Sequence, residues 1–240
     1  MKEKQPLSIV VLAGGLATRL RPMTATLPKS MIEIAGKPFI HHQLKCFERQ
    51  GIEQVVICTG FLGEQIQSYV EEKQHCFNLD VQFSYDGEKL LGTAGAIKKT
   101  LDQLSDNFFV IYGDSFLSCD FNRVENFFIK SEKLALMTVY KNHNQGDKSN
   151  IVFQNGKIIN YDKINQTSEM QYIDYGLGIF NKRVFVQVPE AEPYDLAVLY
   201  QALLTENKLA GFEVEERFYE IGSFSGIEET SDFIRQEEDL

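Results

Sequence analysis

Hydrophobic residues in the first half of the chain alternate between short continuous runs and longer stretches in which they recur every three or four positions. Continuous runs are typical of strands buried on both faces, and the wider spacing is typical of helices that bury one face. Their alternation predicts a largely parallel sheet with helices on its faces. We predict strands at 9–12, 55–58, 81–84 and 108–112, and helices at 38–51, 65–72 and 93–104.

The second half of the chain is richer in strand patterns. The letters NGK at Asn155–Lys157 predict a tight hairpin turn. The fold class we expect is therefore α/β, a Rossmann-like mixed, mainly parallel sheet flanked by helices, with a small β-rich lobe. We predict further strands at 134–140, 151–153, 158–161, 172–180, 212–214 and 217–221, and helices at 196–205 and 226–234.

Length and composition favour one domain over residues 1–240. No internal repeat or low-complexity linker interrupts the 240 residues, and 43% hydrophobic content with 18 Phe and 10 Tyr supports a packed interior. Phe127 and Phe128 are expected in that core. The four histidines, His41, His42, His75 and His143, show no catalytic or metal-binding spacing and are expected at the surface or in the core.

The charge and the cysteines limit the class of partner and the compartment. The chain carries 34 acidic and 24 basic residues, a formal charge of −10, which argues against nucleic acids and membranes as partners. The cysteines at 46, 58, 76 and 119 have no C-x-x-C spacing, so free thiols in a reducing cytosol are expected. Eight residues precede the first strand, too few for a signal peptide, and no apolar run approaches the ~20 residues of a membrane span. We expect a cytoplasmic protein.

A glycine-rich turn follows the first predicted strand and leads to cations. Gly14 and Gly15 allow close backbone approach to a ligand. Arg19 then supplies a guanidinium fork and Lys29 an ammonium, a combination that suits a polyphosphate. A surface loop with scattered charge is the alternative. The segment matches neither the G-x-x-x-x-G-K-[ST] phosphate loop nor the G-x-G-x-x-G dinucleotide pattern, so it would hold a nucleotide by another device.

This segment resembles the signature of the sugar-1-phosphate nucleotidyltransferases, L-A-G-G-x-G-T-R-L-x-P-x-T-x-x-x-P-K. Ala17 stands where that family usually has glycine. The resemblance implies that a sugar 1-phosphate attacks the α-phosphorus of a nucleoside triphosphate and releases pyrophosphate. It implies catalytic roles for Arg19, on the β- and γ-phosphates, and Lys29, on the α-phosphate and the sugar phosphate. The residues in register with the signature are Leu12, Ala13, Gly14, Gly15, Thr18, Arg19, Leu20, Pro22, Thr24, Pro28 and Lys29, of which the first five are expected to bind the nucleotide.

Two carboxylates are the candidate metal ligands. Asp114 follows an uncharged strand, where a buried carboxylate needs a donor or a metal; capping of the next turn is the alternative. The resemblance implies that it binds Mg²⁺. The family's second ligand is an aspartate in a D-x-G-T-like motif, and this chain has Glu220, followed by Ile221, Gly222 and Ser223. Glu220 is expected to bind Mg²⁺ too, with a structural salt bridge as the alternative.

Three further segments carry weaker resemblances to the family. Gly92 and Thr93 open a predicted helix, whose free amides can contact a nucleobase; a plain helix start capped by Thr93 is the alternative. Lys163 matches the lysine of the family's E-K-P segment, which contacts the sugar phosphate. Asp174 and Gly176 fall on its N-x-G-x-Y sugar-binding strand. Because an ionised aspartate only accepts hydrogen bonds, the sugar is expected to present hydroxyl groups there.

Within the family the chain looks most like the heptose 1-phosphate guanylyltransferase branch, which implies GTP as the donor and a product for cell-surface polysaccharide synthesis. The resemblance rests on GKPF at 36–39, LGTAGAI at 91–97 and GDSF at 113–116, with RQGIEQVVICTG at 49–60. Glucose or mannose 1-phosphate with other nucleotides stays open, as does a homo-oligomer. A glycosyltransferase would usually carry D-x-D where Asp114 is followed by Ser115 and Phe116. A catalytically inactive regulatory homologue would be expected to lose Arg19, Lys29 or Asp114.

Overall fold

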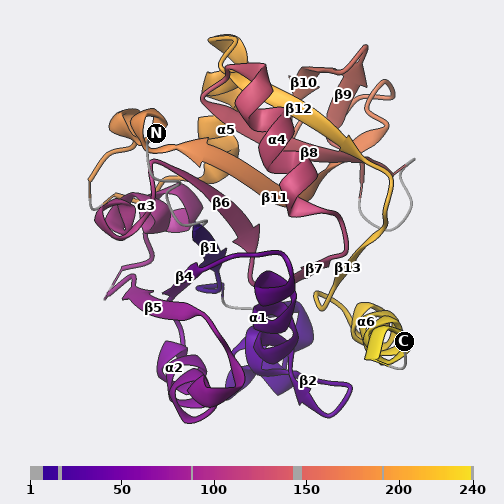
Figure 1. Cartoon of the computed structure of the whole chain (residues 1–240). Coiled ribbons are helices and arrows are strands. Elements are labelled where there is room, and N and C mark those ends of the chain that lie inside the picture. The colour runs from indigo at the N-terminus through magenta and orange to yellow at the C-terminus, as the bar shows by residue number, and fades with distance from the viewer. Residues whose placement is uncertain (1–7, 16–17, 88, 143–147, 191, 239–240) are drawn as a thin grey trace.

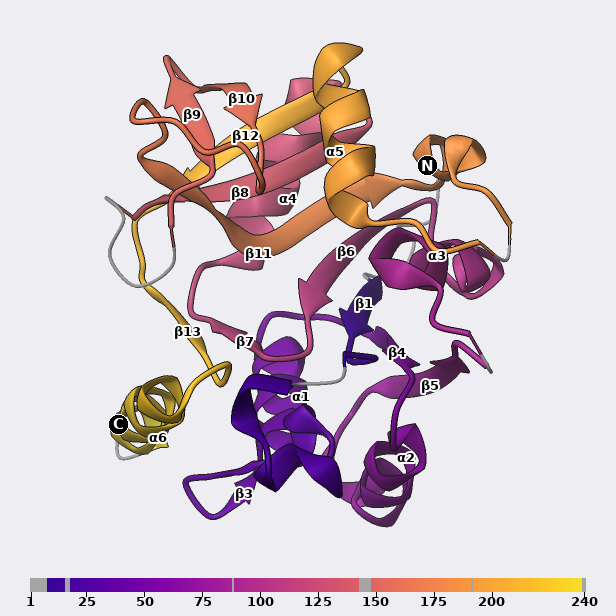
Figure 2. The ribbon, with the colours of Figure 1, turned by 180° about the vertical axis from the view of Figure 1, so that it is seen from behind.

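A computed structural model describes residues 8–15, 18–87, 89–142, 148–190 and 192–238. Within these residues nine strands form one mixed sheet (Figures 1 and 2). Its parallel part places β1 (Ser8–Leu12) between β6 (Asn107–Tyr112) and β4 (Gln54–Thr59), with β5 (Asp80–Tyr85) beyond β4. β1, β4 and β6 coincide with continuous apolar runs, and β5, in which apolar and polar residues alternate, covers the strand predicted at 81–84, so the prediction for the first half of the sheet is confirmed.

The second half of the chain extends the same sheet with mixed pairing. The long strand β11 (Tyr172–Asn181) runs antiparallel to both β6 and β8 (Ala135–Lys141), and β12 (Leu209–Val214) is parallel to β8. A hairpin of β9 (Ile151–Gln154) and β10 (Lys157–Tyr161) joins the start of β11. Its turn has positive φ at Asn155 (50°) and Gly156 (74°), as the NGK letters predict.

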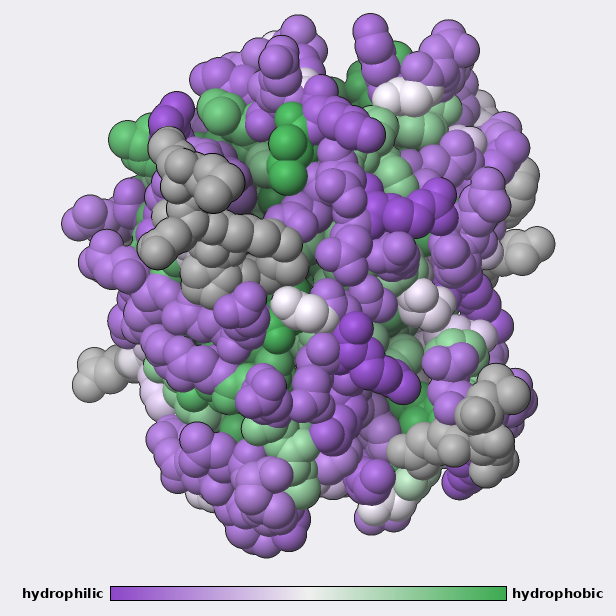
Figure 3. Space-filling model, viewed as in Figure 1, coloured by the Kyte–Doolittle hydropathy of each residue, from purple (hydrophilic) through white to green (hydrophobic). Residues whose placement is uncertain are grey.

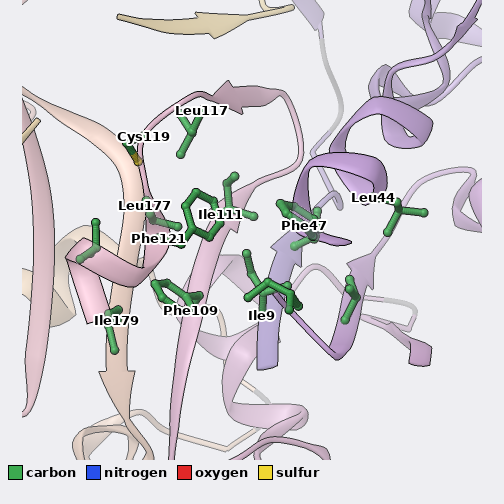
Figure 4. Packing of buried hydrophobic residues seen from close by; sticks show 14 of the residues in the cluster. Ile9, Leu44, Phe47, Phe109, Ile111, Leu117, Cys119, Phe121, Leu177 and Ile179 are labelled. Carbon is green, nitrogen blue, oxygen red and sulfur yellow. The ribbon is translucent and has the colours of Figure 1, made fainter. Parts of the chain in front are cut away.

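Helices cover both faces of the sheet because alternate residues of its strands point to opposite sides. Ile9 and Val11 of β1 pack with α1 (Phe39–Arg49), α2 (Gly63–Glu72) and α4 (Phe121–Ser131). Figure 4 shows part of this cluster, with Phe47 of α1 reaching toward Ile9. Val10 faces the other side, where α3 (Gly92–Lys99) and α5 (Leu196–Thr205) bury their apolar residues.

A third cluster holds the loops beside the carboxyl ends of the parallel strands. Leu20, Phe116 and Ile221 pack there with Ile234 of α6 (Phe224–Glu238). Two short antiparallel pairs belong to this region, β7 (Ser115–Leu117) with β13 (Phe218–Glu220) and β2 (Glu33–Ile34) with β3 (Lys37–Pro38). Figures 1 and 2 show β13 leading from the upper strands down to α6. The cluster thereby fixes the segments that follow β1, β6 and β13.

Two local predictions need correction, and one helix was missed. Phe127 and Phe128 lie on helix α4, which the sequence analysis did not predict; Phe128 is buried, but Phe127 is 39% exposed and packs on Phe212. The helix predicted at 93–104 ends at Lys99, and a separate 3₁₀ turn follows at Leu101–Gln103. Thr100 lies between them, and its hydroxyl donates to the carbonyl of Ile97. This bond to the third preceding residue tightens the end of the helix.

Most of the described histidines and cysteines are buried. His41 and His42 are buried on α1, and His75 is exposed. His143 lies outside the described residues. All four cysteines are free, and burial raises the pKa of Cys46 to about 11 and of Cys58 and Cys119 to about 12. These three buried thiols are therefore poor nucleophiles at neutral pH.

Candidate active site

The glycine-rich turn and the Gly-Asp turn lie side by side at the carboxyl ends of β1 and β6. The amide of Ala13 donates to Cys58 O at 2.8 Å, and the amide of Gly113 donates to Leu12 O at 2.9 Å. A β-carbon at Gly113 would lie 2.9 Å from the Cα of Ala13, so only glycine fits this approach. Ligands of open α/β sheets collect at this edge. The turn after β6 therefore brings Asp114 beside Gly14 and Gly15.

A cavity of about 300 Å³ opens between these turns and the start of α3; we call it the turn cavity. Of the predicted nucleotide-binding residues, Thr18 does not line it, and residue 17 lies outside the described chain. The lining residues are Leu12, Ala13, Gly14, Gly15, Lys29, Ser30, Cys58, Asp86, Leu90, Gly92, Thr93, Ala96, Tyr112, Gly113 and Asp114. The structure thus brings together residues from six segments, most of which the sequence motifs predict.

A second cavity of about 520 Å³ adjoins the first; we call it the lobe cavity because β11 and the 148–166 region form much of it. Tyr112 and Asp114 line both cavities. The lobe cavity is lined by Arg19, Tyr112, Asp114, Ser115, Lys148, Asn150, Lys163, Gln166, Ile173, Asp174, Tyr175, Gly176, Phe218 and Glu220. All three predicted sugar-site residues and both predicted metal ligands are among them.

Lys29 and Asp114 form an ion pair where the cavities meet. Lys29 Nζ lies 2.8 Å from Asp114 Oδ2, and the two side chains are 18% and 28% exposed. The next residue, Ser30, donates its hydroxyl to Gly113 O at 2.9 Å. The segment after Pro28 is therefore attached to the turn that carries Asp114, and its ammonium faces the same space as that carboxylate.

Asp114 and Glu220 fit a magnesium site of the kind completed by a substrate. The described residues contain no group of three His, Cys, Asp or Glu side chains arranged for a metal. However, β13 pairs with β7, and the Ile221 amide donates to Asp114 O at 3.0 Å, which brings both carboxylates to one cavity. Mg²⁺ commonly takes one or two carboxylates together with water and phosphate oxygens. The pair matches this donor set.

Arg19 also lies at this end of the lobe cavity. A β-carbon at Gly222 would lie 3.3 Å from both Arg19 Nη2 and Glu220 Oε1. The absence of a side chain at Gly222 therefore leaves space for the guanidinium of Arg19 and the carboxylate of Glu220, which both lie close to its backbone. An exposed guanidinium in this place is available to a polyphosphate that extends out of the turn cavity.

The residues predicted to bind the sugar meet around Asp174. Its Oδ1 accepts from the Gly176 amide at 3.0 Å, and Gly176 has a φ of 97°, which explains the glycine. Oδ2 is buried, and no described residue hydrogen-bonds to it. Burial raises the pKa of Asp174, an effect that the Lys163 charge partly offsets. Lys163 Nζ lies 5.6 Å from the centre of the Tyr112 ring. An unpaired buried oxygen here calls for a hydrogen-bond donor from a ligand.

Gly92 and Thr93 line the turn cavity and also contact the segment before α5. Gly92 has a φ of 70°, and a β-carbon there would lie 2.8 Å from Tyr194 O. Thr93 does not cap its own helix; its Oγ1 accepts from the amide of Leu196 at 2.7 Å, at the start of α5. The alternative in which Thr93 caps the helix it opens is therefore wrong. The base-contact role stays a prediction.

Gln43 on α1 is a site residue that the sequence analysis missed. Its side chain is 1% exposed, and Nε2 donates to Ser115 O at 2.7 Å and to Tyr112 O at 3.1 Å. These carbonyls stand on either side of the turn that carries Asp114. No local motif marks Gln43, because its partners are about 70 residues away. Gln43 therefore positions Asp114 from the helix behind it.

We expect Gln43→Leu to lower both stability and turnover. The change removes two donors to buried carbonyls at nearly constant volume, which costs about 1–3 kcal/mol, and a shifted Asp114 lowers kcat by about 10-fold. Gln50→Leu is the matched control, since Gln50, the residue directly after the same helix, donates to Cys119 O, away from Asp114. Urea unfolding and steady-state rates should show that Gln50→Leu loses stability only. Wild-type kcat in folded Gln43→Leu would refute the positioning role.

The comparisons place this chain in a known family. The nucleotidyl transferase family matches residues 8–237. The D-glycero-alpha-D-manno-heptose 1-phosphate guanylyltransferase of Aneurinibacillus thermoaerophilus is 30% identical over 217 residues, covering 89% of this chain and 92% of that protein. The UTP–glucose-1-phosphate uridylyltransferase of Synechocystis sp. is 30% identical over 205 residues, covering 78% and 52%. The chain spans about half the length of that second relative.

Solved structures share the fold. HddC from Yersinia pseudotuberculosis has a TM-score of 0.78 at 22% identity, covering 95% of this chain and 99% of that one. A UDP-glucose pyrophosphorylase solved with UDP-glucose has a TM-score of 0.79 at 16% identity, covering 97% and 99%. The predicted mixed sheet with its β-rich extension is thus confirmed.

The chain belongs to the nucleotidyl transferase family, and the relatives that it matches among curated proteins include sugar-1-phosphate nucleotidyltransferases. The resemblance inferred from the glycine-rich segment is therefore confirmed at the level of the family and the enzyme class. In the part of the chain that the structure describes, no helix is long and apolar enough to span a membrane. The face shown in Figure 3 is mostly hydrophilic.

Proposed function

We propose that this chain joins a sugar 1-phosphate to a nucleoside triphosphate, forming a nucleoside-diphosphate sugar and pyrophosphate. The observation that carries the proposal is the meeting of the two cavities at Asp114, which lines both. A triphosphate in the turn cavity and a sugar phosphate in the lobe cavity would meet there, beside the Lys29 ammonium. Membership of the family over residues 8–237 supports the same reaction.

The proposed reaction requires that the sugar phosphate be aligned with the α-phosphorus and that the negative charge of the phosphates be neutralised. A phosphate oxygen of the sugar 1-phosphate forms a bond to the α-phosphorus while the bond from that phosphorus to the β-phosphate oxygen breaks. The nucleophile is already ionised at neutral pH, so no general base is needed. Lys29 would bind the α-phosphate and the incoming sugar phosphate, and Arg19 the departing β- and γ-phosphates. Both cations stabilise charge that shifts toward the leaving group.

Mg²⁺ is the cofactor that we assign to Asp114 and Glu220. When bound, the ion supplies Lewis-acid stabilisation of the phosphate oxygens. The two carboxylates would otherwise repel a polyanion, and the chain as a whole is acidic, with a formal charge of −10. The cations that offset this charge come from separate segments of the lobe cavity, at Arg19, Lys148 and Lys163. Local positive charge in the lobe cavity is what an anionic substrate requires.

Within this class we propose GTP and a heptose 1-phosphate as the substrates. We also propose that the protein works in the reducing cytosol, where cysteines such as its four free ones stay unpaired. Support comes from the heptose 1-phosphate guanylyltransferase relative, of which this chain covers 92%. Glucose or mannose 1-phosphate with thymidine, uridine or cytidine triphosphate is the alternative. The uridylyltransferase relative, which has the same 30% identity to this chain, supports that alternative.

A pyrophosphate-release screen tests the proposal. Five nucleoside triphosphates would be combined with a panel of sugar 1-phosphates, and we expect GTP with a heptose 1-phosphate to give the fastest Mg²⁺-dependent release. Release with another pair would retain the reaction and correct its substrates. No release from any pair, under conditions in which the folded chain binds a nucleotide, would favour the inactive regulatory homologue.

Asp174 is expected to select the sugar. Asp174→Ala removes one buried acceptor of the lobe cavity and should raise KM for the sugar 1-phosphate about 10- to 100-fold, the cost of one or two hydrogen bonds to a charged group. KM for the nucleotide should stay within about two-fold. Asp174→Asn keeps one acceptor oxygen and should recover most of the affinity for hydroxyl groups. Equal rises in both KM values for Asp174→Ala would contradict a sugar-binding role.

A further inference from the structure

The turn after β10 carries Lys163, and a neighbouring carboxylate fixes the backbone of that turn. Asp162 Oδ1 accepts from the amides of Ile164 at 2.8 Å and Asn165 at 2.9 Å, and its Oδ2 accepts from Asn165 Nδ2 at 3.0 Å. The Asp162 amide donates to the carbonyl of Asn150, a residue of the lobe cavity wall, at 3.0 Å. Both carboxylate oxygens of Asp162 are therefore engaged within the turn, which leaves Lys163 as the residue that it brings to the lobe cavity.

An aromatic ring lies beside the charged end of Lys163. The ammonium nitrogen lies over the Tyr112 ring, 5.6 Å from its centre. Among the described residues, none hydrogen-bonds to this ammonium or forms an ion pair with it. The side chain is exposed, so its four-carbon stem would otherwise sample many rotamers. A lysine ammonium within about 6 Å of a ring centre is attracted to the negative face of the ring. The contact with Tyr112 therefore limits where the ammonium lies.

The Tyr112 ring is itself fixed by the sheet. Tyr112 ends β6, where it pairs with Leu12 of β1, and its carbonyl accepts from Gln43 at 3.1 Å. On the side of β11, a β-carbon at Gly176 would lie 3.5 Å from Tyr112 Cδ2, so the backbone of that strand packs against the ring. Because the ring is held and the lysine stem is flexible, the ring sets the position of the ammonium.

The carboxylates of the lobe cavity are competitors for this ammonium. Asp114 and Asp174 line the same cavity as Lys163. A mobile ammonium would be drawn into an ion pair with one of them, and the cation would then be lost to a phosphate. The face of an aromatic ring attracts the ammonium without neutralising its charge. An ammonium held by the ring therefore stays available to a phosphate oxygen.

We propose that Tyr112 is a positioning residue, whose ring face holds the Lys163 ammonium in the lobe cavity where the phosphate of the sugar 1-phosphate binds. This inference rests on the proposed function, because it concerns the second substrate of that reaction. Two competing roles for Tyr112 are a direct contact between its ring and the sugar, and a purely structural contribution to the end of β6. Neither of these roles depends on the presence of Lys163.

A double-mutant cycle of Tyr112→Leu and Lys163→Gln separates these roles, with steady-state rates on the pair of substrates that wild type uses fastest. Tyr112→Leu should raise KM for the sugar 1-phosphate about 3- to 10-fold, the range of a cation–π contact. Its kcat should stay within about two-fold, because the ammonium contacts the phosphate before and during the reaction. In the Lys163→Gln background, the same change should raise KM by less than about two-fold. Tyr112→Phe keeps the ring face and should stay within about two-fold of wild type.

Fluorinated phenylalanines at position 112 test the contact at nearly constant side-chain size. Each added fluorine reduces the negative charge on the ring face, so KM for the sugar 1-phosphate should rise step by step with Lys163 present and stay constant in Lys163→Gln. Phe77→Leu is the matched control, because Lys45 lies over the Phe77 ring at the same 5.6 Å and neither residue lines either cavity. This control should keep the KM of both substrates.

Two results would overturn the positioning role. Tyr112→Leu might raise KM equally with and without Lys163, which would show a direct sugar contact or a structural role. If Tyr112→Leu does not fold, a KM that is independent of fluorination overturns the role as well. In both cases, pyrophosphate release by wild type leaves the proposed reaction standing. Absence of release from every substrate pair would count against the reaction itself, and against this inference with it.

Discussion

Replacing Lys29 with alanine is expected to lower turnover at least about 100-fold. The ammonium is 2.8 Å from Asp114 and faces the junction of the two cavities, where the α-phosphate would react. The side chain is 18% exposed and its loss leaves a partly solvated carboxylate, so unfolding free energy should fall by only about 1 kcal/mol. Steady-state rates of pyrophosphate release and urea unfolding curves measure both quantities.

Lys45→Ala is the matched control for Lys29→Ala. Lys45 forms an ion pair of the same length, 2.8 Å, with Glu48 on the outer face of α1. The control should therefore lose a similar ion pair and keep its turnover. A Lys29→Ala variant with wild-type kcat and KM would remove Lys29 from the proposed catalytic group.

Asp114→Asn is expected to have the largest effect. The amide keeps the size of the side chain but loses the charge that would hold Mg²⁺ and pair with Lys29. We expect turnover to fall about 1000-fold and the remaining rate to lose its dependence on Mg²⁺ concentration. Mn²⁺ binding in the presence of nucleotide, followed by paramagnetic resonance, should weaken in parallel.

Asp102→Asn controls for the loss of one negative charge, because Asp102 is exposed on the 3₁₀ turn that precedes β6, at the other end of that strand. Its turnover and its Mg²⁺ response should match wild type. Normal turnover of Asp114→Asn at low Mg²⁺ would place the metal elsewhere and leave Glu220 without its proposed partner.

The part of the fold that follows local patterns was predictable. The buried strands of the parallel half are continuous apolar runs, and the hairpin turn needs the two positive φ values that Asn155 and Gly156 adopt readily. Helix α4 was missed although its buried residues, Phe121, Val124 and Phe128, recur at helical spacing; the sequence analysis assigned only the adjacent pair Phe127 and Phe128 to the core. Strand β7 has three residues and exists through its pairing with β13, about a hundred positions later in the chain.

The residues of the candidate site also fall into two groups, those in local motifs and those brought in by the fold. Gly14, Lys29 and Asp114 stand in local motifs, so their residue types and spacing are enough to indicate a phosphate site. Gln43 and Asp86 carry no such motif. Gln43 acts through carbonyls that α1 meets only when it packs on the sheet, and Asp86 reaches the turn cavity through the strand order β6-β1-β4-β5. Residues that reach the site only through strand order or helix packing leave no local sequence pattern, so a sequence motif cannot identify them.

A crystal structure of the chain with GTP and Mg²⁺ tests the central claim most directly. The account predicts the triphosphate beside Gly14, Gly15 and Lys29, the metal on Asp114 and Glu220, and the base at the start of α3. A nucleotide bound away from both cavities, for example in the groove between α4 and β10 that Phe127 and Ile159 line, with the turn cavity unfilled, would contradict it.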